Sequence, residues 1–300
     1  MNTTQKVIKG FAICLAVLII LSIINGIVFL ATSTINFNND VNISETYSSN
    51  IKNINIDVGS TNMIIKKGNT LSVNADNVSK EFKIKEDGNT LLIKEKRITI
   101  FGNKKGSHTI ITIPDTLEDL HIDIGAGKLE ISDITTDKFS LEQGAGKVDI
   151  TNLLSSKTKV DGGDGELNIT NSKLQDLSLD LGAGKFYFNG MLLGKNKIDQ
   201  GVGEVTLDLQ GDDYKFEASK GLGSITINSV NYKKDIELGE GQNLIDIDGG
   251  VGSININTNK WGSRYETSFI FLYHYYYHYY QKNLLYRHPI LQQISIMFLG

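Results

Sequence analysis

The sequence predicts an all-β protein, a β-solenoid built from coils of about 19 residues with two short strands each, preceded by one transmembrane α-helix. A Gly-x-Gly unit recurs at a nearly constant interval, and apolar residues alternate with polar ones on both sides of each unit. An apolar run near the N-terminus predicts the helix. The chain holds 30 glycines but only 2 prolines, which indicates that glycine makes the bends.

The repeat is defined by its glycines. The first glycine of each unit stands at Gly125, Gly144, Gly163, Gly182, Gly201 and Gly221, in steps of 19, 19, 19, 19 and 20 residues. Weaker copies begin at Gly239 and Gly250. The glycines predicted to make the bends are Gly125, Gly127, Gly144, Gly146, Gly163, Gly165, Gly182, Gly184, Gly201 and Gly203. Apolar residues precede and follow each unit at fixed positions, as Ile122, Leu129 and Ile131 do in the first, which predicts two strands joined at a bend.

A unit of this length cannot bury its own apolar face, but it can do so against identical neighbours. Stacked coils would pair equivalent strands in parallel, about 4.8 Å apart. An antiparallel sandwich also contains many short strands, but nothing in it requires a constant period. The constant interval therefore favours the solenoid.

The chain divides into five predicted segments. We expect the β-repeat domain at residues 50–261, a cytoplasmic N-terminus at 1–10, a transmembrane helix at 11–31, a polar linker at 32–49 and an atypical Tyr/His-rich tail at 262–300. The 21 residues of the helix, a nearly unbroken apolar run, would span about 30 Å, the thickness of a bilayer's hydrocarbon core.

The charges beside the apolar run predict its orientation. Lys6 and Lys9 precede it and the next basic residue is Lys52, so the positive-inside rule places the repeat domain outside the cytoplasm of a single-pass membrane protein. A cleaved signal peptide is the alternative, although its apolar region is usually only about 7–15 residues long. The single cysteine, Cys14, lies in this run and excludes an intramolecular disulfide; a buried membrane cysteine is favoured over a lipoprotein site.

The segment before the regular repeats predicts an irregular cap for the open end of the stack. Residues 55–59 resemble a degenerate first copy, ending at Gly59. Residues 82–93 predict a hairpin with an Asp-Gly turn, and residues 98–100 and 109–113 a second hairpin.

The tail is centred on residues 273–280, a run of tyrosine and histidine without any repeat. A metal or aromatic-ligand site and a second membrane-associated segment are alternatives, but no apolar run in the tail approaches 20 residues. A shifted or extended reading frame is the favoured explanation.

An acidic residue stands two positions before the first glycine in five successive units. These residues, the candidate surface ladder, are Asp123, Glu142, Asp161, Asp180 and Asp199. Ser219 interrupts the pattern, Glu237 and Asp248 resume it, and Asp57 stands at the same position before Gly59. Stacked carboxylates about 5 Å apart would repel each other by roughly 1–3 kcal/mol.

Two interpretations of this ladder stay open. It could bind a cation or another ligand, or it could be a solvated face whose charges keep sheets from sticking together, which is the favoured interpretation. Lys128, Lys147 and Lys185 lie across the same bend in some coils only. The calcium-binding nonapeptide repeat is approached at 162–167 and 249–254, but an apolar residue stands where its aspartate ligand belongs.

We predict that the protein is not an enzyme and has no catalytic, cofactor-binding or metal-binding residues. The Gly-Ala-Gly-Lys stretches continue into Leu129, Val148 or Phe186 and a strand, whereas a phosphate-binding loop requires Ser or Thr and a helix. His108 and His121 are expected on the surface. A net charge of -4 gives no reason to expect nucleic acid as a partner.

The repeats at residues 122–131 and 179–186 resemble the bacterial putative-adhesin family of unknown function. The resemblance covers about residues 50–259, and the tail beyond 262 departs from it. It implies stacked β-repeats similar to toast-rack domains, often behind one membrane helix. The family carries no established catalytic residues, so none is transferred.

The resulting hypothesis is a membrane-anchored structural or adhesin-like interaction module at the cell envelope. The expected partners are the membrane, through the N-terminal helix, and envelope proteins or a cell-wall polymer. The alternatives are an accessory protein of envelope-stress signalling and a cation- or glycan-binding surface on the acidic ladder.

Overall fold

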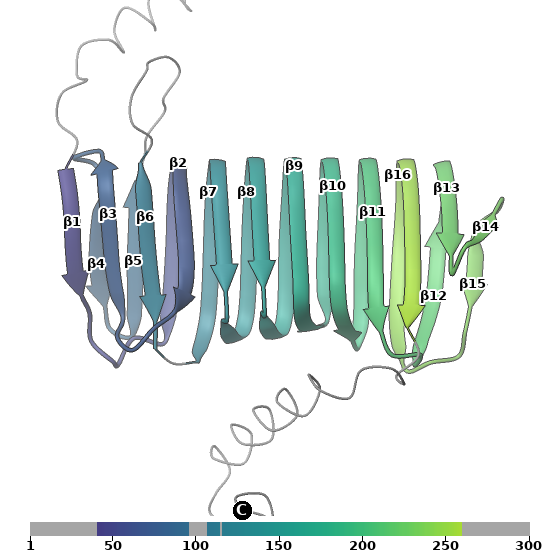
Figure 1. The fold of residues 1–300 in the computed structure, drawn as a ribbon, viewed down its shortest axis with the longest axis horizontal. Helices are drawn as coiled ribbons and strands as arrows, with labels where there is room; N and C mark the ends of the chain where they lie inside the picture. The colour runs from purple at the N-terminus through teal and green to yellow at the C-terminus, as the bar shows by residue number, and fades with distance from the viewer. Residues whose placement is uncertain (1–40, 96–106, 115, 260–300) are drawn as a thin grey trace, which may run out of the picture.

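The computed structural model describes residues 41–95, 107–114 and 116–259, and it shows one elongated stack of strands (Figure 1). The strands are β1 (Val41–Thr46), β2 (Asn53–Lys67), β3 (Ser72–Val78), β4 (Lys83–Asp87), β5 (Thr90–Glu95), β6 (His108–Ile113), β7 (Leu117–Ser132), β8 (Thr135–Thr151), β9 (Leu154–Gln175), β10 (Leu177–Leu193), β11 (Lys195–Gln210), β12 (Tyr214–Ser219), β13 (Leu222–Ile227), β14 (Val230–Tyr232), β15 (Ile236–Leu238) and β16 (Asn243–Asn259).

All regular elements of the described residues are strands, so the all-β prediction is confirmed. They form one 16-stranded sheet whose main path runs β1-β3-β6-β2-β7-β8-β9-β10-β11-β16-β12-β15. From β2 to β12 along this path every neighbouring pair is parallel. The 19-residue offset appears directly in the register, in which Ile122 pairs with Leu141 and Gly127 with Gly146.

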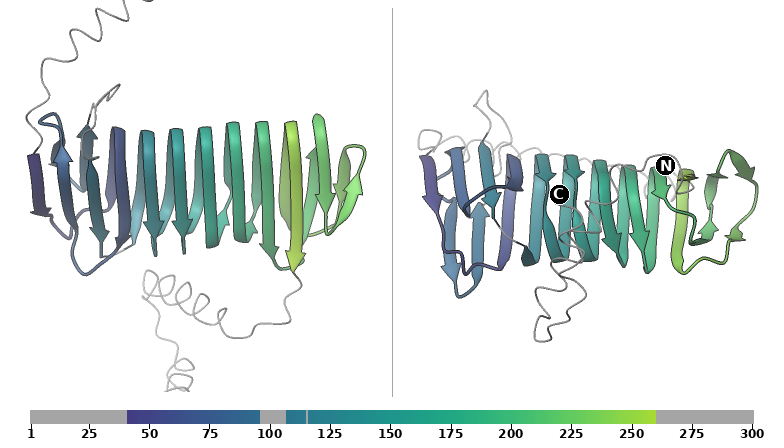
Figure 2. Two further views of the ribbon diagram at one scale, coloured as in Figure 1. Left: turned by 45° about the horizontal axis from the view of Figure 1, so that its top comes forward. Right: turned by 60° about the horizontal axis from the view of Figure 1, so that its bottom comes forward.

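Each long strand folds back on itself at its Gly-x-Gly unit, so that the stack has two faces (Figure 2). We call the face formed by the half-strands before the glycines the leading face, and the one formed by the half-strands after them the trailing face. The glycines form the bend edge. The sequence predicted two short strands per coil, but backbone pairing continues through the bend, where Ala126 pairs with Ala145, and one strand of 16 to 22 residues results.

The core lies between the two faces. The buried side chains of β7 include Ile122, Leu129 and Ile131, and in β10 Phe186 and Phe188 fill the same layer as Leu129 and Ile131. Period-two alternation places these residues inward and their neighbours in solvent, as the sequence predicted. Full burial of such a side chain stabilises the fold by about 1.5–3 kcal/mol, so each coil depends on the coils that cover it.

The C-terminal coils do not follow the order of the sequence. β16 lies between β11 and the outermost coil, which β12 and β13 form. Gly250 therefore stacks on Gly201, and the copy at Gly221 is displaced outward by one coil. The predicted copy at Gly239 is wrong, because this glycine lies after β15 in a turn with φ of +85°.

At the N-terminal end, residues 55–59 do form a first coil, since β2 pairs in parallel with β7. The predicted Asp-Gly hairpin is β4–β5, in which Asp87 pairs with Thr90 around Gly88. Residues 98–100 of the second predicted hairpin lie outside the described residues. β6 instead pairs in parallel with β2 and antiparallel with β3.

The domain begins before residue 50. Residues 41–46 of the predicted linker form β1, which pairs antiparallel with β3. The strand escaped the sequence analysis because it is an edge strand, mostly exposed or half-buried, and shows no buried apolar alternation. The predicted membrane helix at 11–31 and the tail at 262–300 lie outside the described residues. Among the residues that are described, no helix is long and apolar enough to cross a membrane.

Candidate functional site

The bend edge requires glycine because successive coils are in close contact there. A Cβ on Gly146 or Gly203 would lie less than 3.0 Å from the carbonyl oxygen of the matching glycine in the preceding coil, and both glycines have positive φ values. In the first coil Thr61 occupies the second glycine's position. It is tolerated because β5 and β6 pair with β2 only up to Val58 and from Asn62, so no glycine of a preceding coil stacks against it. Thr61 is buried there, and its hydroxyl donates to the Ser107 carbonyl.

The register places all five residues of the predicted ladder opposite one another on the leading face. Asp57 and Asp248 extend the row at its two ends, and Ser219 of β12 terminates it with a hydrogen bond to Asp248. We call these seven carboxylates the acidic ladder: Asp57, Asp123, Glu142, Asp161, Asp180, Asp199 and Asp248. Glu237 is not part of it, because β15 runs antiparallel to β12 and pairs Glu237 with Glu217.

The charges of the ladder are offset unevenly. Lys159 and Lys197, each two residues before a ladder aspartate, form ion pairs of 2.7 Å with Asp161 and Asp199. Asp123 has no such lysine in its strand. Burial raises the pKa of the Asp123 carboxyl, the neighbouring carboxylates of the ladder raise it further, and His121 lowers it.

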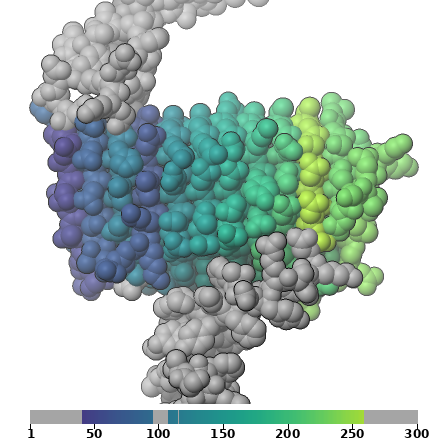
Figure 3. Space-filling view, in the orientation of Figure 1, coloured from purple at the N-terminus to yellow at the C-terminus, as the bar shows by residue number. Residues whose placement is uncertain are grey.

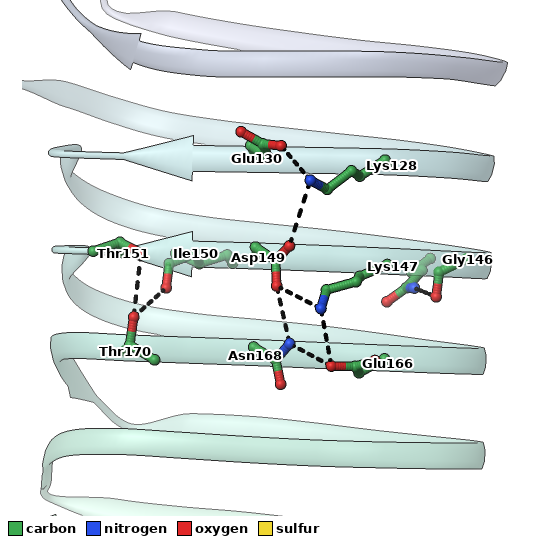
Figure 4. A network of polar contacts seen from close by, with 11 residues as sticks. Lys128, Glu130, Gly146, Lys147, Asp149, Ile150, Thr151, Glu166, Asn168 and Thr170 are labelled. Carbon is green, nitrogen blue, oxygen red and sulfur yellow. Dashed lines mark hydrogen bonds and ion pairs between the residues drawn. The ribbon is translucent and has the colours of Figure 1, made fainter.

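The trailing face carries an ion-pair network that the sequence analysis did not identify (Figure 4). Lys147 Nζ lies 3.5 Å from Asp149 Oδ1 and 3.1 Å from Glu166 Oε1 of the next coil. Asn168 Nδ2 donates hydrogen bonds to both acids, at 2.9 and 2.7 Å. The hydrogen bond from Asn168 and then that from Lys147 hold the pKa of Glu166 below its usual value. Lys128 joins Glu130 to the same cluster.

The lysines expected across the bend thus pair with acids of their own face, and not with the ladder. Lys185 makes a longer pair with Glu204, at 3.9 Å. The alternation of Lys and Glu three positions after the first glycine, combined with the acids at the fifth position in the first two coils, was the pattern that could have predicted this network.

A second row of bend residues, also missed, lies at the edge opposite the glycines. Asp133, Asn152 and Asn171 have φ values of 61°, 58° and 50°, and Asn152 Nδ2 donates to Asp133 Oδ1 at 2.7 Å. Asp and Asn tolerate this left-handed conformation better than other residues with a side chain. Their position eight residues after the first glycine repeats with the period of the coils.

The described residues contain no group of three or more His, Cys, Asp or Glu side chains arranged to hold a metal ion. The ladder carboxylates follow one another at the spacing of parallel strands, about 4.8 Å, on an open face. A catalytic or binding role for them is not shown by this arrangement, and the surface ladder stays a prediction.

Fold and bend together define a class of protein, a two-faced stack of β-coils with glycines at one edge. Residues 34–256 match the family described as Toastrack DUF4097, and the chain belongs to this family. This family match agrees with the toast-rack type of domain that the repeats predicted.

Two solved structures are similar to this chain. A structure titled as a putative cell adhesion protein from Clostridium sporogenes is 17% identical, covers 74% of this chain and 100% of its own, and has a TM-score of 0.35. A structure titled as a putative adhesin from Bacteroides fragilis is 16% identical, covers 73% of this chain and 98% of its own, and has a TM-score of 0.49. No curated protein matches the sequence.

Proposed function

We propose that this protein is a non-enzymatic, adhesin-like interaction module of the cell envelope, held at the membrane by residues 11–31 with its β-stack outside the cytoplasm. One observation carries the proposal: backbone pairing continues in parallel through every coil from β2 to β11 and into β16. Such a stack holds its outward side chains in straight rows at a fixed spacing. It presents a long surface for contact and needs no catalytic group to do so.

The edge strand at the N-terminal end of the stack is charged, which favours contact with a partner through specific surfaces and not through open strand edges. β4, the outermost strand of the leading face at the N-terminal end, has the sequence Lys-Ile-Lys-Glu-Asp and is largely exposed. Charged edge strands discourage unspecific pairing with other sheets. The resemblance of the repeats to the adhesin-like family points to the same role.

Location is tested by labelling intact cells with a membrane-impermeant thiol reagent. The full chain with Asp212→Cys in an exposed loop and Cys14→Ser is compared with the Cys14→Ser chain alone. We expect labelling of Asp212→Cys from outside the cell. Labelling only after lysis would contradict an extracytoplasmic stack.

Interaction is tested by retention of the purified full chain on isolated cell-wall polymer and on solubilised envelope proteins. We expect saturable retention by one of the two. The matched control is Gly203→Ala, which disrupts the bend edge and leaves every outward charge in the sequence unchanged. The absence of retention in both fractions, or equal retention of the control after it has lost its β-sheet circular dichroism, would contradict the proposal.

The acidic ladder favours a second candidate role, cation binding, because seven carboxylates are in register. Calorimetry with calcium on the parent protein and on Asp161→Asn/Asp180→Asn tests it. Equal heats in both proteins would exclude the ladder as a calcium site. The envelope-stress hypothesis stays a prediction of the sequence, and unchanged stress reporters in a deletion strain under cell-wall antibiotics would refute it.

A further inference from the structure

The C-terminal half of the bend edge carries a row of exposed apolar side chains. The residue between the two glycines points outward there, and Ala183, Val202, Val251 and Leu222 follow one another in parallel register. We call these four residues the apolar ridge. Val202 is 54% exposed, Val251 46% and Leu222 83%.

The bend itself does not require apolar residues at this position. In the N-terminal half the same place between the glycines is occupied by Ser60, Ala126, Ala145 and Asp164, in the same register. The geometry of the bend therefore accepts a polar or small side chain at this position. Three adjacent branched apolar residues in solvent are a contiguous patch, which is the kind of surface that a partner covers.

The two sides of the ridge differ in charge. On the leading side lie Asp180, Asp199 and Asp248 of the acidic ladder, and within the described part of the chain one of these three, Asp199, forms an ion pair, with Lys197. On the trailing side Lys185 pairs with Glu204, and the next two coils place serines at this position. At the Leu222 end Lys220 places one positive charge at the bend, where its Nζ donates to the Gly223 carbonyl. Away from that end, one flank of the ridge is negative and the other is nearly neutral. A partner that covers the ridge should carry positive charge on one side only.

The spacing of the ridge distinguishes a helix from a strand. Neighbouring coils are about 4.8 Å apart, so three steps from Ala183 to Leu222 cover about 14 Å. Three turns of an α-helix cover about 16 Å, whereas same-side residues of an extended strand are about 6.6 Å apart and cover about 20 Å in three steps. An amphipathic helix can therefore place one apolar residue per turn near each ridge residue, and an extended peptide cannot.

We propose that the apolar ridge docks an amphipathic helix of a partner protein, with the apolar face of the helix on the ridge and its lysines or arginines facing Asp180, Asp199 and Asp248. The inference rests on the proposed interaction function, to which it assigns a surface and a class of partner. The negative flank opposes the alternative, an anionic membrane surface.

The experiment measures fluorescence anisotropy of a labelled synthetic helix added to the full chain. The probe peptide has leucines at helical spacing and lysines along one flank. We expect saturable binding that weakens at least tenfold in Val202→Thr/Val251→Thr/Leu222→Thr. The matched control is Val230→Thr, because Val230 is also 54% exposed but lies on β14, off the ridge. Its affinity should equal that of the parent protein.

Two altered peptides test charge and shape. Replacing the lysines by glutamates should weaken binding at least tenfold, and Asp180→Asn/Asp199→Asn should reduce the dependence of binding on salt. A peptide of the same composition with alternating apolar residues, which favours an extended strand, should bind at least tenfold more weakly. Circular dichroism shows that each variant keeps its β-sheet.

Several results would overturn the inference: no saturable binding, equal loss in Val230→Thr, or equal binding of the glutamate or the extended peptide. Sedimentation with anionic vesicles that depends on the three ridge residues would assign the ridge to a membrane surface instead. The outcome is separable from that of the proposed function. If envelope fractions retain the ridge variant as well as the parent chain, the docking inference is refuted and the proposed function is not. If they do not retain the parent chain, the proposed function is refuted.

Discussion

The two faces of the stack follow opposite electrostatic patterns although they are built from the same coils. On the leading face, carboxylates stand in an unbroken row from Asp57 to Asp248. On the trailing face, Lys147 lies between Asp149 and Glu166 in a network of ion pairs. Figure 3 shows how closely successive coils follow one another on the viewed surface.

The difference follows from parallel register. A repeat that places the same residue type at the same position in each coil aligns like charges, because equivalent residues become direct neighbours. The trailing face aligns Lys128 with Lys147 and Glu130 with Asp149, but there each lysine forms an ion pair with an acid. From Lys147 onward the charge at this position alternates, through Glu166, Lys185 and Glu204. The leading face keeps the like charges and offsets two of them with Lys159 and Lys197.

Breaking the bend that joins the two faces should have the largest effect. In Gly203→Ala the new Cβ meets the Gly184 carbonyl oxygen and the residue must adopt a φ of +141°. We expect a loss of about 3 kcal/mol or more in the free energy of unfolding, since overpacking and a strained backbone each cost about 1–3 kcal/mol. Urea denaturation measures it.

Gly182→Ala is the matched control, because its Cβ would lie 3.2 Å from the nearest backbone oxygen and its φ is not positive. We expect a loss of less than about 1 kcal/mol, a value below the range for full overpacking. Equal destabilisation by the two substitutions would contradict the close contact proposed for the glycine column.

Removing one acid from each face should change stability in opposite directions. Asp123→Asn should raise the free energy of unfolding by about 0.5–1 kcal/mol, because it relieves repulsion from Asp57 and Glu142. Asp149→Asn should lower it by a similar amount, because Lys128 and Lys147 lose a partner. Thermal unfolding at low and high salt measures both. The same sign for both variants would show that the faces do not differ.

The smallest expected effect is the pH dependence of the free energy of unfolding that arises from one carboxyl group on each face. The raised pKa of Asp123 means that the folded protein binds the proton more readily, so this group's penalty is present at neutral pH and is relieved as pH falls through the folded pKa. The lowered pKa of Glu166 contributes stability above its unfolded pKa, and this is lost as pH falls through the folded pKa.

Asp123→Asn and Glu166→Gln should therefore change the acid limb of a stability–pH curve in opposite directions. Unfolding midpoints measured from neutral pH down into the acid range test this. Parallel shifts of the two curves, with no change of slope, would contradict the assigned pKa directions.

The sequence predicts the middle of the stack well because the determinants there are local and periodic. Gly144 and Gly146, the alternation around them and the acid at Glu142 define both the bend and the row of charges. The missed corner at Asp133 and Asn152 has the same period, but its residues are common in many kinds of turn.

The ends of the stack could not be read from local patterns. β16 lies between β11 and β12, and no residue of the connection at 211–213 indicates that the chain skips one place. Glu237 fitted the acidic pattern for the same reason that Gly239 fitted the glycine pattern: their spacing alone cannot show that β15 runs antiparallel. The trailing network depends on pairs of positions in different coils, which a search along one strand does not compare.

Disulfide formation tests the stacking order most directly. In a Cys14→Ser background, Asp199→Cys/Asp248→Cys joins register partners, whereas Asp199→Cys/Ser219→Cys joins residues on either side of β16. The second pair lies about two strand spacings apart, roughly 9.6 Å, beyond the reach of a disulfide. We predict intramolecular oxidation of the first pair and not of the second. Oxidation of the second pair without the first would show that the coils stack in sequence order, and would contradict the register on which both faces depend.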